Sequence, residues 1–474
     1  MSLQQVFARC AAAALVAATF TLPAWAALPI QKWQQPSGAQ VWFVEVPGLP
    51  IVDVQIDFDA GERRDPSDKS GLADVTASMT AKGLEARNGQ PPLDENQLGE
   101  AWADLGAGFG ASAGQDRMSF TLRSLTYPEL LQKAVALGAR QLGEPAFPDN
   151  VWQRDRQRMI ASIREANTKP GTIAARTFNQ AVYGTHPYGY DTTEESLGRI
   201  SVQDMRNFYR TVQPCRAKVS VVGAVNRAQA DQIVTSLLSR LPAAACQPLP
   251  PVPEVAPLSA SAERNVPFAS AQAHVLIGQP GYKRSDPDYF PLLVGNYILG
   301  GGGFVSRLVE EVRHKRGLSY SVYSYFAPAM HAGAFILGLQ TRPDQAAQAV
   351  QVSRDVVRRF VAEGPTEAEL KAAKDFMIGG FALRIDSNRK LLDNLANIAW
   401  YDLPLDYLDT WTRQVEKVTA ADIRAAFARK LQPDRMVTVV VGADVAAAPD
   451  SKPFPDAPPL SILTGVGVQA GGPG

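Results

Sequence analysis

The chain has 474 residues, with 47 basic and 47 acidic side chains and a formal net charge of zero at pH 7. This length is too great for one ordinary hydrophobic core and predicts at least two domains. The balanced charge argues against nucleic acid or an anionic membrane surface as the main partner.

Residues 1–26 have the pattern of a secretory signal peptide. A single arginine precedes an apolar run that ends in Ala24-Trp25-Ala26, the small-residue pattern of a cleavage site. The run is too short to predict a membrane span, so we expect a mature chain without one, exported to the periplasm. The mature chain keeps two cysteines, Cys215 and Cys246, which pair in an oxidising compartment or remain as buried free thiols.

The first part of the mature chain mixes strands and helices. Apolar and alternating patterns predict strands at residues 40–46 and 52–58, followed by four helices. The predicted helices span residues 72–81, 94–105, 127–142 and 151–168. Between the second and third helix, the alanine- and glycine-rich residues 107–114 are predicted as a poorly specified strand with an open groove beside it.

Two segments far apart in the sequence repeat one pattern. Ser201 and Asp204 open a helical stretch that ends in an apolar strand at residues 219–222. Thr419 and Asp422 open a second such stretch, which ends in an apolar strand at residues 437–441. In both, a hydroxyl residue is followed three positions later by an acid, which is a variant of the helix capping box. The chain is therefore predicted to be a duplication of two similar halves.

The halves are predicted to span residues 27–245 and 263–446. Residues 246–262 between them are rich in proline and predict a stiff, extended linker, and residues 447–474 predict a disordered or surface-lying tail. In the second half we expect strands at 273–277 and 334–339 and helices at 289–298 and 345–363. This order predicts an α+β fold, in which helices cover one face of each sheet and the two halves form a clamshell.

The helix predicted at residues 70–83 carries the first functional motif. Its apolar positions Leu72, Val75 and Met79 have helical spacing. The phrase resembles the catalytic helix of the insulinase/pitrilysin-type zinc peptidases, which carries His-x-x-Glu-His, two zinc ligands around a general base.

The resemblance places Asp74 and Ser78 at the positions of the two histidines and Ala77 at the position of the glutamate. The third zinc ligand of the family, a glutamate in a later helix, aligns best with Ser162, and a shifted register would use Glu165. None of the four histidines of the chain has a second histidine three to five residues away. We therefore expect no metal site in this chain.

A second motif, in residues 301–322, is intact. It begins with Gly301 and Gly302 and contains Arg313 and, seven positions later, Tyr320. Taken singly, Arg313 is as compatible with a solvated helix face and Tyr320 with a strand aromatic that fills the core. In the family that the chain resembles, this arginine anchors the substrate backbone and this tyrosine supports the oxyanion. The glycine run lacks the lysine of a phosphate-binding loop.

The resemblance covers residues 28–445 and is specific to the two-subunit bacterial branch of the family. It implies a non-catalytic subunit of a periplasmic zinc peptidase heterodimer, inactive alone. A homologous partner with His-x-x-Glu-His would hold the zinc, and the substrate would be an unfolded peptide. Two alternatives remain open, a structural or peptide-binding module without a role in proteolysis, and an independent metalloprotease with a rearranged site.

Overall fold

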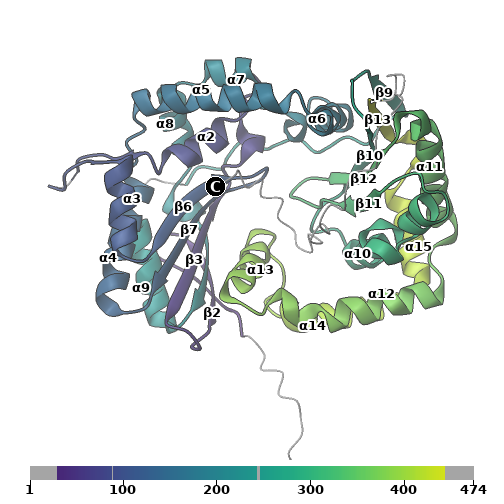
Figure 1. Ribbon diagram of the computed structural model, residues 1–474. Coiled ribbons are helices and arrows are strands. Elements are labelled where there is room, and N and C mark those ends of the chain that lie inside the picture. The colour runs from purple at the N-terminus through teal and green to yellow at the C-terminus, as the bar shows by residue number, and fades with distance from the viewer. Residues whose placement is uncertain (1–28, 88, 243–245, 443–474) are drawn as a thin grey trace, which may run out of the picture.

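The computed structural model describes residues 29–87, 89–242 and 246–442 (Figure 1). The predicted signal peptide and the predicted tail lie outside these residues. Within the described ranges, no helix is both long and apolar enough to cross a membrane.

A six-stranded sheet forms the first half. Its strands are β1 (Gln31–Gln34), β2 (Gln40–Glu45), β3 (Ile51–Phe58), β6 (Gly108–Ala113), β7 (Met118–Leu125) and β8 (Lys218–Gly223), in the spatial order β1-β2-β8-β3-β7-β6. Only the β2–β8 pair is parallel among these strands. A separate short ladder joins β4 (Gly83–Leu84) and β5 (Leu93–Asp94).

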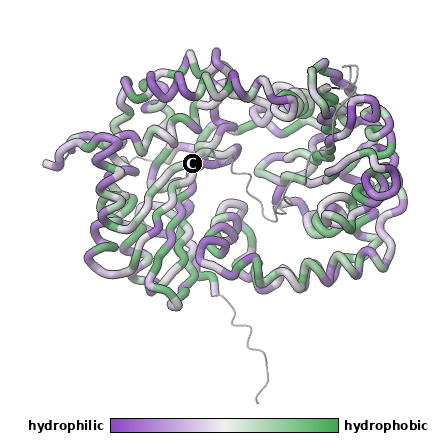
Figure 2. The backbone as a smooth tube through the Cα atoms, in the orientation of Figure 1, coloured by the Kyte–Doolittle hydropathy of each residue, from purple (hydrophilic) through white to green (hydrophobic). Residues whose placement is uncertain are grey.

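Eight helices belong to the described residues of the first half. They are α2 (Leu72–Met79), α3 (Glu95–Asp104), α4 (Pro128–Gly143), α5 (Asp149–Ala166), α6 (Pro170–Tyr183), α7 (Glu194–Arg199), α8 (Val202–Tyr209) and α9 (Arg227–Leu238). Figure 2 shows that α5, at the top of the view, is largely hydrophilic, and Trp152 is its fully buried side chain. It therefore forms an outer layer over α2.

A five-stranded sheet forms the second half. Its strands are β9 (Ala262–Val266), β10 (Ala273–Tyr282), β11 (Ser321–Phe326), β12 (Gly333–Thr341) and β13 (Val437–Val441), in the order β11-β12-β10-β13-β9. Its helices are α10 (Tyr289–Asn296), α11 (Ala346–Glu363), α12 (Glu367–Gly379), α13 (Asn388–Trp400), α14 (Tyr407–Lys417) and α15 (Ala420–Lys430).

The two sheets have the same topology. Leaving β1 aside, each sheet places its strands in the order first, fifth, second, fourth, third, and in each the first and fifth strands run parallel. The predicted capping boxes are also present, because Ser201 caps α8 with Asp204 and Thr419 caps α15 with Asp422. The internal repetition predicted from the sequence is thus confirmed.

Each sheet also receives one helix from the other half. Helix α6, which comes from the first half, packs on β10 and β13 of the second sheet, where Phe178 is 1% exposed. Helix α13, from the second half, packs on β8 and β3 of the first sheet, and Figure 1 shows it beside these strands. The expectation of helices on one face only is therefore wrong, since an apolar helix stripe does not reveal which sheet it will cover.

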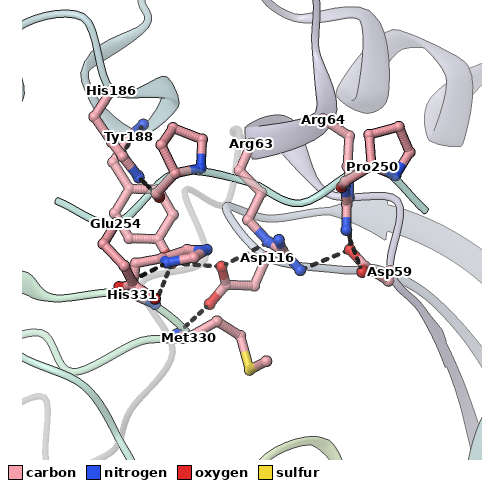
Figure 3. A network of polar contacts seen from close by, with 11 residues as sticks. Asp59, Arg63, Arg64, Asp116, His186, Tyr188, Pro250, Glu254, Met330 and His331 are labelled. Carbon is pink, nitrogen blue, oxygen red and sulfur yellow. Dashed lines mark hydrogen bonds and ion pairs between the residues drawn. The ribbon is translucent and has the colours of Figure 1, made fainter. Parts of the chain in front are cut away.

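The proline-rich segment is tied to both halves (Figure 3). Nε2 of His186 lies 2.9 Å from the carbonyl oxygen of Pro253, and Glu254 accepts a hydrogen bond from Lys283 at 2.6 Å. Of the two alternatives for the cysteines, the structure contains the disulfide, between Cys215 and Cys246. This bond fixes the start of the segment next to β8.

Asp116 is the centre of the polar network in Figure 3. Its carboxylate accepts from the hydroxyl of Tyr188 at 2.5 Å, accepts from the backbone N–H of Met330 at 2.9 Å and pairs with Arg63 at 3.2 Å. The backbone N–H of His331 in turn donates to the Tyr188 hydroxyl at 3.1 Å. Because Met330 and His331 belong to the second half, this buried carboxylate connects the two halves.

Candidate functional site

Helix α2 is fixed at both its start and its inner face. Gly71 adopts the left-handed conformation with φ of 95° just before the helix. The carboxylate of Asp65 then accepts from the backbone N–H groups of Gly71 at 2.8 Å and Ala73 at 2.9 Å, which satisfies donors that a helix start leaves free. The apolar stripe of α2 packs against Trp152 of α5.

The positions assigned to zinc and base by resemblance lie on this helix. Asp74 and Ser78 are exposed on the same side, one turn apart, whereas Ala77 is buried. The Ser78 hydroxyl donates to the carbonyl oxygen of Val75 at 3.0 Å. Alanine has no donor atom for a metal, and this serine hydroxyl is engaged with the backbone. These side chains therefore do not fit zinc.

Two carboxyl groups beside α2 have altered acidity. Burial by the surrounding protein raises the pKa of Asp74, although its side chain still reaches solvent. Burial raises the pKa of Glu62 to about 7, and the negative charge of Asp74 adds to this rise.

The third predicted position lies on α5. Ser162 and Glu165 are both exposed, and Glu165 pairs with Lys169 at 2.9 Å, a hydrogen bond that lowers the pKa of its carboxyl. No set of three histidine, cysteine or acidic side chains that is suited to hold a metal ion occurs within the described part of the chain.

The glycine run of the second motif is required by close packing. After α10 the chain forms a π-helical turn, Tyr297–Gly301. A Cβ atom on Gly300 would lie 2.5 Å from the backbone nitrogen of Ser324 in β11, and one on Gly302 would lie 2.7 Å from the carbonyl oxygen of Tyr297. The glycines therefore let this turn lie directly against β11.

Arg313 and Tyr320 lie together. Arg313 lies near the end of a second π-helical turn, Val309–His314, and Tyr320 directly precedes β11. The guanidinium carbon of Arg313 lies 4.9 Å from the centre of the Tyr320 ring, over its face. Tyr320 is 62% exposed, so the alternative that it fills the core is wrong. The backbone thus presents a cation and a phenol side by side at the surface.

The same site contains one aromatic residue that the sequence analysis missed. Phe304 lies in the short turn Gly303–Val305, and its ring centre is also 4.9 Å from the guanidinium carbon of Arg313. The sequence signal that could have revealed Phe304 is its place directly after the glycine run, because a large apolar residue is unusual in such a turn.

The open groove expected at residues 107–114 corresponds to β6, the edge strand of the first sheet beside α2. A Cβ atom added to Gly108, Gly110 or Gly114 would meet no other atom within 4 Å. The face of β6 toward which these Cβ atoms would point therefore has free space beside it. Helix α2 and β6 belong to the first half and Arg313 and Tyr320 to the second, and the described residues show no hydrogen bond or ion pair between these two sets.

Comparisons with known proteins agree with this architecture. The family model for insulinase (peptidase family M16) matches residues 41–195, and the model for the peptidase M16 inactive domain matches residues 199–377. A crystal structure of a peptidase M16 inactive domain from Pseudomonas fluorescens is 32% identical, with a TM-score of 0.81, over 89% of this chain and 100% of that one.

Two further relatives have lower identity. The non-peptidase homolog YmxG of Helicobacter pylori is 27% identical over 368 residues, which are 72% of this chain and 83% of that protein. The periplasmic protease PqqL of Escherichia coli is 15% identical with a TM-score of 0.74, over 87% of this chain and 45% of that one, and shows the fold alone. The solved structures confirm the expected α+β fold of two halves. The chain therefore belongs to the insulinase-type peptidase family M16.

Proposed function

We propose that this chain is the non-catalytic subunit of a periplasmic zinc peptidase heterodimer. One observation carries the proposal: Tyr320 is exposed beside the half-buried Arg313, while α2 has Ala77 and Ser78 where zinc chemistry needs a base and a ligand. A homologous partner with an intact His-x-x-Glu-His would supply the metal. This chain would supply the second set of groups to the same active site.

The chemistry of the pair suits peptide hydrolysis. The Arg313 guanidinium has several N–H donors and would bind the carbonyl groups of an extended peptide. The Tyr320 hydroxyl, which has no hydrogen-bond partner among the described residues, would donate to the oxygen that becomes negative as the peptide bond is attacked. We include Gly301 and Gly302, at the end of the turn before Phe304, in the proposed substrate-binding site.

Export to the periplasm is supported by two features. Residues 1–26 have the signal-peptide pattern, and the Cys215–Cys246 disulfide is of the kind that persists in oxidising compartments. Within the mature chain we propose functional halves at residues 27–245 and 263–446. Because the halves exchange α6 and α13, we expect them to act as one rigid unit that a partner binds as a whole.

Reconstitution tests the proposal. This chain, a sister chain with intact His-x-x-Glu-His and an equimolar mixture are each assayed with an internally quenched fluorogenic peptide. We expect cleavage by the mixture to exceed the sum of the separate chains by at least about tenfold, since a missing oxyanion donor costs about 100-fold or more in rate. Equal cleavage by the sister chain alone would exclude a shared site.

A second candidate function is a peptide-binding module without a role in proteolysis. The position of β6 at the edge of its sheet favours it, because an extended peptide can add to a sheet edge through backbone hydrogen bonds. Under this alternative the chain alone would bind a labelled unfolded peptide, and Tyr320→Phe would change neither that binding nor the activity of any mixture. Under the heterodimer proposal, Tyr320→Phe lowers the activity of the mixture.

A further inference from the structure

Aromatic rings, and no carboxylate, hold Arg313. Its guanidinium carbon lies 4.9 Å from the ring centres of both Phe304 and Tyr320, over the face of each ring. Across the described ranges, this guanidinium makes neither a hydrogen bond nor an ion pair with another side chain. Because a ring face accepts no conventional hydrogen bond and no side chain among the described residues accepts one from this guanidinium, its N–H groups remain available to a ligand.

The neighbouring acidic side chains are engaged elsewhere. Glu311 accepts from Lys315 at 2.8 Å, and Glu310 lies 3.1 Å from Nδ1 of His314. Neither of these carboxylates is paired with Arg313. The position of the guanidinium therefore depends on the two rings.

Phe304 is exposed and does not belong to the hydrophobic core. Its side chain is 66% exposed, and the preceding Gly303 holds the turn in the left-handed conformation with φ of 59°. A phenylalanine this exposed contributes little to the core, since burial of apolar surface is what stabilises a fold. Its defined contact is the one with Arg313.

We propose that Phe304 is a positioning residue that holds the Arg313 guanidinium with its N–H edge free for a peptide carbonyl. The inference rests on the proposed function, because Arg313 is the group that binds the substrate. Tyr320 provides one aromatic contact to the guanidinium, and Phe304 adds a second contact that limits its rotation. An arginine side chain otherwise has high conformational freedom, which binding must restrict.

The test uses the reconstituted heterodimer and a fluorogenic peptide. Phe304→Leu keeps an apolar side chain of similar size and removes the ring, whereas Phe304→Trp keeps a ring that binds cations well. We expect Phe304→Leu to raise KM about two- to fivefold with little change in kcat, as loss of one exposed cation–π contact implies, and Phe304→Trp to retain the wild-type KM. Val305→Ala, in the same turn and 76% exposed, is the matched control and should leave KM unchanged.

A double-mutant cycle with Arg313→Met tests whether Phe304 acts through the arginine. If it does, Phe304→Leu has no further effect once Arg313 is replaced. An equal effect of Phe304→Leu in both backgrounds, or a wild-type KM for Phe304→Leu, would overturn the inference. If Arg313→Met itself leaves the activity intact, the proposed function fails as well, so the two failures are distinguishable.

Discussion

Nζ of Lys218 lies 2.9 Å from the carbonyl oxygen of Ala399 and 3.1 Å from that of Trp400. Lys218 begins β8 of the first half, whereas Ala399 and Trp400 end α13 of the second half. The ammonium group thus satisfies carbonyls that a helix end leaves without partners, and its charge is favourable at the negative end of the helix dipole. One side chain therefore fastens the exchanged helix to the sheet that it covers.

Removing this cap should loosen the contact between the halves. Lys218→Met keeps the aliphatic part of the side chain and deletes the donors, so we expect the free energy of unfolding to fall by about 1–3 kcal/mol. Urea denaturation followed by circular dichroism measures the change. Lys371→Met is the control, because Lys371 pairs with Asp375 on the exposed surface of α12 and such pairs contribute about 0–1 kcal/mol. Equal losses in both variants would contradict a special role of Lys218.

The other exchanged helix is held by apolar packing. Phe178 of α6 is 1% exposed and lies against Gly278 of β10 in the second sheet. Phe178→Ala should lower the free energy of unfolding by about 3–5 kcal/mol, because it leaves a cavity between the halves. Leu383→Ala, at a side chain that is 67% exposed, should change it by less than about 0.5 kcal/mol. A small loss for Phe178→Ala would mean that α6 is not needed on the second sheet.

Protonation of His186 at acid pH should destabilise the folded chain, because His186 contacts both the backbone of Tyr188 and the proline-rich segment. Burial lowers the pKa of His186, and its Nδ1 accepts from the backbone N–H of Tyr188 at 3.1 Å, which requires the neutral ring. The unfolded chain therefore binds this proton more readily than the folded protein. The folded state keeps the full contribution of His186 above pH of about 6.5 and loses it progressively as the pH falls below that value.

Comparison with His186→Gln isolates this effect. The nearby groups His331, Glu254 and Asp116 are present in both proteins. Their titration therefore cancels, to a first approximation, in the difference in unfolding free energy between the two proteins. We expect the wild type to lose more unfolding free energy than His186→Gln between about pH 7 and about pH 5. The same pH dependence in both proteins would contradict this expectation, because it would show that His186 has the same pKa in the folded and unfolded states.

The disulfide should stabilise the chain measurably. Cys215 and Cys246 are separated by 31 positions, and closing a loop of this length reduces the entropy of the unfolded chain by the equivalent of about 3–4 kcal/mol. Replacing both cysteines by alanine should lower the unfolding free energy by about that amount. Addition of a reductant should destabilise the wild type and leave the double variant unchanged. Insensitivity of the wild type to full reduction would contradict this expectation.

Local signals in the sequence predicted much of the fold. The caps Ser201 and Thr419 and the apolar strands after them revealed the duplication, because capping and strand patterning are decided by neighbours in the sequence. The exchange of α6 and α13 was not predictable in this way. An amphipathic stripe such as that around Phe178 shows that a helix face is buried, but the sheet that covers it is set by tertiary packing.

The candidate site was also predictable only where local sequence signals define it. The spacing of Arg313 and Tyr320 pointed to one site, and the structure brings their side chains together. The contact of Phe304 with Arg313 depends on a left-handed glycine and a π-helical turn, Val309–His314, which have no strong sequence pattern. The zinc site that Arg313 and Tyr320 would serve belongs, under this proposal, to a second chain, so this sequence alone could not predict it.

The rate constant of the heterodimer with Tyr320→Phe tests the central proposal most directly. The substitution removes one hydroxyl from a side chain that is 62% exposed and leaves its ring beside Arg313, so folding and assembly should be unchanged. We expect kcat for a fluorogenic peptide to fall by about 100-fold, as for loss of an oxyanion donor, with little change in KM. An unchanged kcat in a correctly assembled heterodimer would show that this chain contributes no catalytic group.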